Sequence, residues 1–167
     1  MTPPGMIMSQ QGGLTFMYRV GGIAVSGGRL LVEHDVRHDL CFVPGGRVEY
    51  GESAAATLAR EVREELGEEV TVGRLVFVSD HLFDLDDDRF QEVALYFVIE
   101  FGPGSAVTGR EGRFAGVEPG TTFEWIPLAS VEAAGLFPAF LRARVGSLPE
   151  GTEYIVESGV EWPSGEP

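Results

Sequence analysis

The sequence predicts a single α/β domain in which a mixed β-sheet lies between helices. Apolar segments rich in β-branched residues, which are typical of strands, alternate with segments of high helix propensity. A chain of 167 residues has enough material for one complete hydrophobic core. Strands and helices interleaved in this way are expected to pack in layers.

The first quarter of the chain begins with a Gly-, Gln- and Ser-rich segment, residues 1–13, which we expect to be mobile. Two strands are predicted next, over residues 16–25 and 29–33. Ser26-Gly27-Gly28 separates them and is typical of a tight hairpin turn. The short apolar segment that follows ends in Pro44-Gly45-Gly46, which indicates a second turn.

A helix is predicted over residues 53–66. The hydroxyl of Ser53 can accept a hydrogen bond from the free N–H groups of the first turn. The following residues have high helix propensity, and neither Pro nor Gly interrupts them before Gly67. A glycine at that position fits the left-handed residue that ends many helices.

Residues 102–120 contain several glycines and prolines and predict a long loop in the second half of the chain. The elements predicted around this loop are strands over 70–81, 93–101, 121–126 and 154–157 and helical segments over 127–134 and 137–146. We therefore expect one domain over residues 14–158, followed by a C-terminal tail over 159–167.

The net charge is −14, and all twelve basic residues are arginines. The absence of lysine excludes P-loop phosphate binding and enzymes that form a Schiff base through a lysine. The acidic balance disfavours nucleic-acid polymers as partners, because binding to them needs a basic surface. An acidic protein can still bind a small phosphate ester when divalent cations bridge the two.

No apolar run approaches the ~20 residues that a membrane span needs, so no membrane partner is expected. The N-terminal segment lacks the cationic and apolar regions of a secretory signal, and we expect a cytoplasmic location. Cys41 is the only cysteine, which excludes an internal disulfide and a cysteine-based zinc site. We expect Cys41 to be a small buried hydrophobic residue.

Three glutamates lie close together on the predicted helix. Glu61 precedes Glu64 by three residues and Glu65 by four, which brings the three side chains to neighbouring positions. Exposed carboxylates at this spacing repel by roughly a few tenths of a kcal/mol per pair. A divalent cation reverses the sign of the interaction, because Mg²⁺ favours carboxylate oxygens. We interpret the cluster as a metal site that Arg60 partly neutralises.

The glycines before the helix fit the same interpretation. Gly45 and Gly46 let the backbone approach closely and expose a carbonyl as a further oxygen ligand. The N-terminus of the helix that follows is suited to a phosphate. An ordinary tight turn is the alternative for these two residues taken alone.

The segment from Gly46 to Gly67 reads G-R-V-E-Y-G-E-S-A-A-A-T-L-A-R-E-V-R-E-E-L-G. It resembles the Nudix box, G-x5-E-x7-R-E-U-x-E-E-x-G-U with U aliphatic, at every fixed position up to Gly67. The last aliphatic position is a departure, because Glu68 stands there, and Val70 is expected to take over its packing role. The order of the surrounding elements is similar to the family over roughly residues 16–146.

The resemblance implies a three-layered α/β/α sandwich and the hydrolysis of a nucleoside diphosphate linked to another group. It implies a Mg²⁺ or Mn²⁺ cofactor and places the chemistry on one set of residues: the carboxylates of Glu61, Glu64 and Glu65 and the carbonyl of Gly45. Other positions of the motif would orient these ligands, namely Gly46, Glu52, Arg60 and Gly67. Glu61, Glu118 or another carboxylate would accept the proton of the attacking water.

Further candidates lie outside the motif. Members of the family can use an acidic residue before the last strand, and Glu118 is our first choice, with Glu111 and Glu124 as rivals. His81 and Phe83 are candidate substrate contacts, although a plain surface histidine is the alternative for His81. Phe90 is a second candidate for stacking on a base.

Two other groups of residues are expected to be structural. Asp84, Asp86 and Asp88 have the alternate spacing of a calcium loop, but Arg89 stands where that loop requires Gly, so a solvated turn is expected. His34 and His38 show no metal spacing and are expected to be exposed.

Three functions are consistent with the sequence. The first is a metal-dependent pyrophosphohydrolase, which all three glutamates favour. The second is a nucleotide- or ADP-ribose-binding module without catalysis, in which the motif is usually eroded. The third is the isoprenoid diphosphate isomerase branch of the same fold, which uses a catalytic cysteine, for which Cys41 is the candidate. The expected partner is a small nucleotide derivative whose identity stays open, and homodimers are common in the family.

Overall fold

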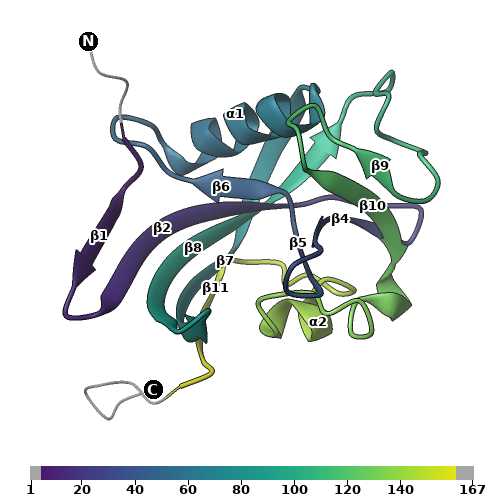
Figure 1. Ribbon diagram of the computed structural model, residues 1–167. Helices are drawn as coiled ribbons and strands as arrows, with labels where there is room; N and C mark the ends of the chain where they lie inside the picture. Colours follow the sequence, from purple (N-terminus) through teal and green to yellow (C-terminus); the bar gives the residue numbers. More distant parts are fainter. Residues whose placement is uncertain (1–4, 161–167) are drawn as a thin grey trace.

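The computed structural model describes residues 5–160, in which two curved β-sheets lie between helices (Figure 1). The larger sheet has six strands in the order β1-β2-β8-β7-β11, with β6 paired to β2. Its strands are β1 (Met8–Gln11), β2 (Leu14–Ile23), β6 (Gly45–Arg47), β7 (Val70–Leu85), β8 (Asp88–Phe101) and β11 (Glu153–Ser158). The β2–β8 and β7–β11 pairs are parallel and the other pairs are antiparallel, so this sheet is mixed, as predicted.

The smaller sheet has five strands, all antiparallel, in the order β3-β4-β10-β9 with β5 paired to β4. Its strands are β3 (Val25–Ser26), β4 (Arg29–Asp35), β5 (Leu40–Phe42), β9 (Phe114–Ala115) and β10 (Thr122–Pro127). The sequence predicted strands near β4 and β10 but did not predict that they form a sheet of their own. The reason is that their pairing joins segments some ninety residues apart, Leu31 lying opposite Trp125.

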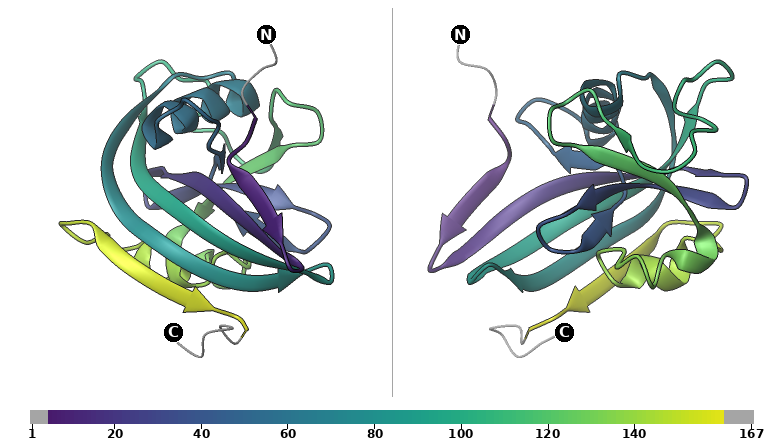
Figure 2. Two further views of the ribbon diagram at one scale, coloured as in Figure 1. Left: turned by 90° about the vertical axis from the view of Figure 1, so that its left-hand side faces the viewer. Right: turned by 45° about the vertical axis from the view of Figure 1, so that its right-hand side comes forward.

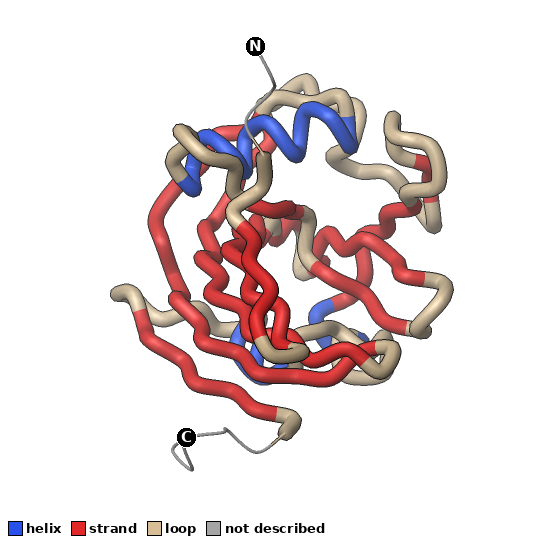
Figure 3. Tube along the Cα trace, turned by 60° about the vertical axis from the view of Figure 1, so that its left-hand side comes forward, coloured by secondary structure: helices blue, strands red, loops and turns tan. Residues whose placement is uncertain are grey.

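Helix α1 (Ala54–Leu66) and the short helix α2 (Phe140–Arg144) lie on opposite sides of the strands (Figures 2 and 3). Strand β4 shows why, because its side chains alternate between two hydrophobic cores. Leu31 packs in the core under α1, whereas Leu30 and Val32 pack in the core under α2. The predicted layered α/β/α architecture is confirmed.

The two ends of α1 are those that the sequence predicted. The backbone N–H of Ala56 donates to Ser53 Oγ at 3.2 Å, which caps the first turn. At the other end Gly67 adopts φ 70°, and its N–H donates to the carbonyl of Arg63. These caps fix the segment on which the three glutamates stand.

The segment at Gly45 and Gly46 is a strand rather than the predicted turn. Gly45 lies opposite Gly21 and Gly46 opposite Val20 in the β2–β6 pair. A Cβ at Gly45 would lie 2.0 Å from the carbonyl oxygen of Val20. Glycine is needed here because two backbones approach closely and not because the chain turns.

Two of the hairpins, β3–β4 and β7–β8, have tight two-residue turns, and the second of them lengthens two of the predicted strands. Gly27 and Gly28 have positive φ and join β3 to β4, as predicted. Asp86 and Asp87 also have positive φ and join β7 to β8. A two-residue turn leaves the neighbouring residues in the ladder, so β7 extends to Leu85 and β8 begins at Asp88.

The helical segments of the second half are shorter than predicted. A 3-10 turn, η1 (Leu128–Ser130), stands in place of the helix over 127–134, and α2 covers only part of 137–146. Gly135 at φ 68° interrupts the chain between them, and α2 begins only after Pro138, which cannot lie inside a helix.

The ends of the chain differ in part from the expectation of mobile segments. Met8–Gln11, within the segment 1–13, pairs with β2 as strand β1, because it finds an open edge of the larger sheet. Residues 1–4, and most of the expected tail, 161–167, lie outside the described residues. Between residues 5 and 160 no helix is long and apolar enough to cross a membrane.

Candidate active site

The three glutamates of α1 differ in their surroundings. The side chain of Glu64 is 55% exposed, whereas Glu65 is buried with a relative exposure of 8%. Glu61 is partly buried against Gly46, where a Cβ would lie 2.2 Å from Glu61 Cδ. The close approach of β6 therefore sets the position of Glu61.

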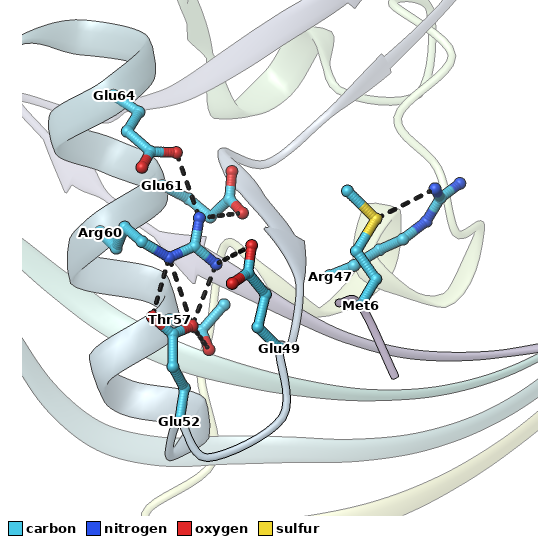
Figure 4. A network of polar contacts seen from close by, with 8 residues as sticks. All are labelled: Met6, Arg47, Glu49, Glu52, Thr57, Arg60, Glu61 and Glu64. Atoms are coloured by element: carbon cyan, nitrogen blue, oxygen red, sulfur yellow. Dashed lines mark hydrogen bonds and ion pairs between the residues drawn. The ribbon is translucent and has the colours of Figure 1, made fainter. Parts of the chain in front are cut away.

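Arg60 is the centre of a network that joins the loop before α1 to its carboxylates (Figure 4). Its Nε donates to Glu52 Oε1 at 2.9 Å, and its Nη2 donates to Glu52 Oε2 at 3.0 Å. Its Nη1 donates to Glu61 Oε1 at 2.9 Å and to Glu64 Oε2 at 3.1 Å. One guanidinium thus holds three carboxylates of the motif, with Glu49 at 3.8 Å as a fourth neighbour.

This network changes the acidity of its members. Hydrogen bonds from Arg60 lower the pKa of Glu52, which also accepts from Thr57 Oγ1 at 2.8 Å. Burial raises the pKa of Glu61, and Arg60 opposes this increase. The carboxylates bound to Arg60 are therefore partly compensated.

Glu65 has no such compensation. Burial raises its pKa to about 8, and the neighbouring carboxylates of Glu33, Glu61 and Glu118 add to the increase. Its Oε2 is buried and has no hydrogen-bond partner within residues 5–160. A buried oxygen without a partner is costly, and such atoms in native structures mark a missing water, ion or ligand.

Glu33 on β4 is a member of this group that the sequence analysis missed. Burial raises its pKa, Arg19 lowers it, and the carboxylates of Glu118 and Glu61 raise it further. The signal in the sequence is weak: a single glutamate follows the buried run Leu30-Leu31-Val32. Only the packing of β4 against α1 places it near Glu65.

Glu118 lies in a loop that is fastened to α1. The N–H of Val117 donates to the carbonyl of Glu65 at 2.7 Å. Glu118 itself is exposed and contributes to the raised pKa of Glu65. Its rivals are engaged elsewhere, since Glu111 pairs with Arg29 and Glu124 accepts from His34.

The departure from the motif at Glu68 and the packing expected of Val70 can both be followed in the structure. Glu68 accepts a hydrogen bond from the N–H of Ala106 at 3.0 Å, so the departure from the motif is absorbed by a polar contact. Val70 packs against the core that contains Val62 and Leu66, as expected.

In the described part of the chain, no three Asp, Glu, His or Cys side chains stand in an arrangement that could hold a metal ion as they are. Glu61 and Glu64 are turned to the same nitrogen of Arg60 instead. The residues nevertheless fit a divalent cation. It would supply a partner for Glu65 Oε2 and offset the mutual repulsion that raises the pKa of this carboxyl.

His81 is not at the surface. It is 3% exposed within β7, and burial lowers its pKa to about 4. Its ring lies between Phe83 and Phe137, with centroid distances of 4.7 and 5.1 Å, and its Nδ1 has no partner among the described residues. The alternative of a surface histidine is wrong, because β7 runs on past His81 and its ring faces the core.

Phe83 lines a cavity of about 320 Å³ at the inner face of the larger sheet. Phe90, the other stacking candidate, lies there as well, at a ring distance of 5.4 Å from Phe83. The cavity is lined by Met17, Arg19, Val20, Gly21, Leu40, Phe42, Val43, Arg47, Phe83, Asp84, Leu85, Phe90, Glu92, Ala94, Tyr96, Phe137 and Pro138. Arg19, Arg47 and Glu92 are its charged members that the sequence analysis missed.

Cys41 is completely buried in β5, as expected, and burial raises the pKa of its thiol to about 11. A thiol with this pKa stays protonated at neutral pH and is a poor nucleophile. Cys41 therefore has the properties of a core residue, which disfavours the isomerase alternative.

Asp84, Asp86 and Asp88 do not converge on one point. Asp84 pairs with Arg89 at 2.8 Å, while Asp86 contacts His38 and Arg37 at the hairpin tip. His34 and His38 are partly buried rather than exposed, because acidic partners hold them: Glu124 binds His34, and Asp35 and Asp86 bind His38.

The model of the NUDIX domain family matches residues 16–143. No curated protein matches the sequence of this chain.

Solved structures share the fold at low sequence identity. A MutT protein from Bacillus halodurans is 18% identical with a TM-score of 0.60, covering 90% of this chain and 93% of that one. A MutT Nudix hydrolase from Burkholderia pseudomallei is 22% identical with a TM-score of 0.53, covering 71% and 95%. An ADP-ribose pyrophosphatase from Streptococcus suis is 17% identical with a TM-score of 0.50, covering 85% and 98%.

Proposed function

This chain belongs to the NUDIX domain family, and from that premise we propose that it is a metal-dependent hydrolase that cleaves a pyrophosphate bond in a nucleoside diphosphate linked to another group. The observation that carries the proposal is the state of Glu65. It is a buried carboxylate with an unpartnered oxygen and a pKa raised to about 8, beside the carboxylates of Glu33, Glu61 and Glu118. A structural role alone gives no reason for this costly arrangement.

The residues that would hold Mg²⁺ or Mn²⁺ are the carboxylates of Glu61, Glu64 and Glu65 and the carbonyl of Gly45, with Glu118 as a further ligand. Hard divalent cations prefer such oxygen donors. When bound, the ion neutralises phosphate charge and makes a water molecule more acidic.

Arg60 would act as a positioning residue. Its forked contact with Glu52 anchors the guanidinium to the loop before α1. From there it orients Glu61 and Glu64, which it binds through a single nitrogen. Gly46 contributes by its lack of a Cβ, which leaves the space that Glu61 occupies.

Three carboxylates are candidates for the base that accepts a proton from the attacking water: Glu61, Glu118 and now Glu33. Burial raises the pKa of Glu33 and of Glu61. A raised pKa suits a general base at neutral pH, and such a base contributes roughly 10²–10⁴-fold to the rate. Glu118 is exposed, so access to water favours it instead.

The substrate would be a small nucleotide derivative and not a nucleic-acid polymer, since the net charge is −14. The Streptococcus suis protein is described as an ADP-ribose pyrophosphatase, which makes nucleotide sugars suitable first compounds to test. A cytoplasmic location and a homodimer stay predictions.

The test is a screen of nucleoside triphosphates, nucleotide sugars and dinucleotides with Mg²⁺ or Mn²⁺, with detection of the phosphate-containing products. We expect turnover of at least one class that stops when the metal is chelated. Tight nucleotide binding without any product after long incubation would instead identify a binding module and refute the hydrolase.

A further inference from the structure

The cavity at the inner face of the larger sheet combines aromatic walls with a few charges. Phe42 and Phe137 come from β5 and from the chain before α2, whereas Phe83 and Phe90 lie opposite each other on β7 and β8. The rings of Phe83 and Phe90 are stacked with an interplanar angle of 21°. At about 320 Å³ the cavity is in the range of small-molecule sites, and its walls suit a flat ring system.

Glu92 is the unusual residue in this cavity. It is 4% exposed, and between residues 5 and 160 its side chain has an ion pair with Arg19 but no hydrogen bond. Its nearest cation is Arg19, whose Nη1 lies 3.8 Å from Glu92 Oε2, beyond hydrogen-bond distance. Neither of its oxygens is among the buried polar atoms that lack a partner, so both reach the cavity that Glu92 lines and can accept hydrogen bonds from a ligand there.

The groups around Glu92 leave its oxygens available. Its neighbours across the sheet are Met17 on β2, which has no donor, and His81 on β7, which is turned between two phenylalanines. Burial raises the pKa of Glu92, and Arg19 and Arg47 oppose this increase. Hydrogen bonds donated by a ligand would act in the same direction as the two arginines and favour the ionised form.

We propose that this cavity binds the base of the substrate and that Glu92 selects a base with two adjacent N–H donors at its edge, which among the common nucleobases is guanine. This inference rests on the proposed function for the nucleotide character of the ligand. An ionised carboxylate only accepts hydrogen bonds, and its two oxygens match two parallel donors. Adenine and cytosine present a donor beside an acceptor, and uracil presents one donor between two acceptors.

The β2–β6 strand pair connects the cavity with the carboxylates of α1. Arg19 and Arg47 lie opposite each other in this pair and line the cavity. Gly46, the residue before Arg47, packs against Glu61. Arg19 also lowers the pKa of Glu61 and of Glu65, which places it between the two groups of acids. A base at Glu92 would therefore direct its phosphates past two arginines toward α1.

The experiment is calorimetric titration of GMP, AMP, CMP and UMP without metal, so that it requires no catalysis. Wild-type protein is expected to bind GMP roughly 10- to 100-fold more tightly than the other three. In Glu92→Gln, the amide offers one donor and one acceptor, so GMP should lose this advantage and AMP should gain affinity. Glu64→Gln is the matched control, an isosteric change on α1 that should keep the wild-type ranking.

A second variant, Glu92→Asp, keeps the acceptor-only carboxylate but shortens its reach. It is expected to bind GMP more weakly than wild type and still to prefer it. Thermal unfolding of each variant verifies that the fold is intact. Equal affinity for the four nucleotides, no binding of any, preference for AMP in the wild type, or an unchanged ranking in Glu92→Gln overturns the proposal. A base preference without turnover would refute the hydrolase and leave this inference standing.

Discussion

The carboxylates of α1 and the aromatic cavity both adjoin the β2–β6 strand pair, yet the chain builds them in opposite ways. The α1 group comes from one short segment, Glu61 to Glu65, and concentrates charge that Arg60 partly compensates. The cavity comes from segments distributed from Met17 to Pro138 and holds one carboxylate without hydrogen bonds to the described residues, that of Glu92, between aromatic walls and two arginines.

The difference separates chemistry from recognition. Changes on α1 are expected to remove turnover but not the preference for a base, and changes at Glu92 are expected to do the reverse. Changes in the strand pair that supports both should affect the two together.

Glu64→Gln is expected to lower turnover by roughly 10³-fold or more, because the amide removes a negative metal ligand. Glu64 is largely exposed, and its contact with Arg60 is at the surface. The free energy of unfolding should therefore change by less than about 1 kcal/mol. Steady-state kinetics and urea unfolding of the same preparation measure both quantities. A fully active variant would show that Glu64 has no part in the chemistry.

Gly45→Ala and Gly46→Ala are expected to differ, although the residues are adjacent. A Cβ at Gly45 would lie 2.0 Å from the backbone oxygen of Val20, which cannot move without parting β2 from β6. We expect a loss of about 3 kcal/mol in unfolding free energy. A Cβ at Gly46 would meet the flexible end of Glu61 instead, so activity should fall by roughly 10- to 100-fold with a smaller loss of stability.

Gly104→Ala is the control for this pair, since nothing lies within 4 Å of the position where its Cβ would stand. It should leave both activity and stability unchanged. If Gly45→Ala and Gly46→Ala changed activity and stability to the same extent, Gly45 would not act through the β2–β6 pairing and Gly46 through the position of Glu61.

His81 is expected to make the protein less stable in mild acid. Its pKa is about 4 when folded, against 6.5 in the unfolded chain, so the unfolded state takes up the proton first. Stability should therefore fall as pH decreases from about 6.5 toward 4, by about 2 kcal/mol between pH 7 and pH 5. His81→Leu should remove this part of the pH dependence, measured by urea unfolding at both pH values.

His38 provides a contrast of opposite sign. Hydrogen bonds to Asp35 and Asp86 raise its pKa, so its contribution to stability is present at low pH and is lost as pH rises through the folded pKa. His38→Gln should make the loss of stability between pH 7 and pH 5 larger than in the wild type. If His81→Leu lost as much stability between pH 7 and pH 5 as the wild type does, protonation of His81 would not be the cause of that loss.

The α1 region could be predicted from the sequence because its information is local. Ser53, the three glutamates and Gly67 act within a single helix, whose spacing and ends follow from short-range rules. The hairpin at Gly27-Gly28 was predicted for the same reason. Such features depend on residues a few positions apart.

The cavity and the second sheet could not be predicted in this way. Glu92 faces Met17 only because β2 and β8 pair in parallel, and Glu33 approaches Glu65 only through packing of β4 on α1. His81 was expected at a strand end, but the turn at Asp86-Asp87 lies further along and leaves it inside the ladder. These positions depend on strand register, which no short segment specifies.

The binding of a divalent cation by the carboxylates of α1 can be examined in a crystal structure of the protein with Mn²⁺, through anomalous scattering. We expect a Mn²⁺ peak in contact with Glu61, Glu64 and Glu65, with Glu61 and Glu64 released from Arg60. A structure in which both carboxylates stay on Arg60, Glu65 keeps an unpartnered oxygen and no ion lies near α1 would contradict it.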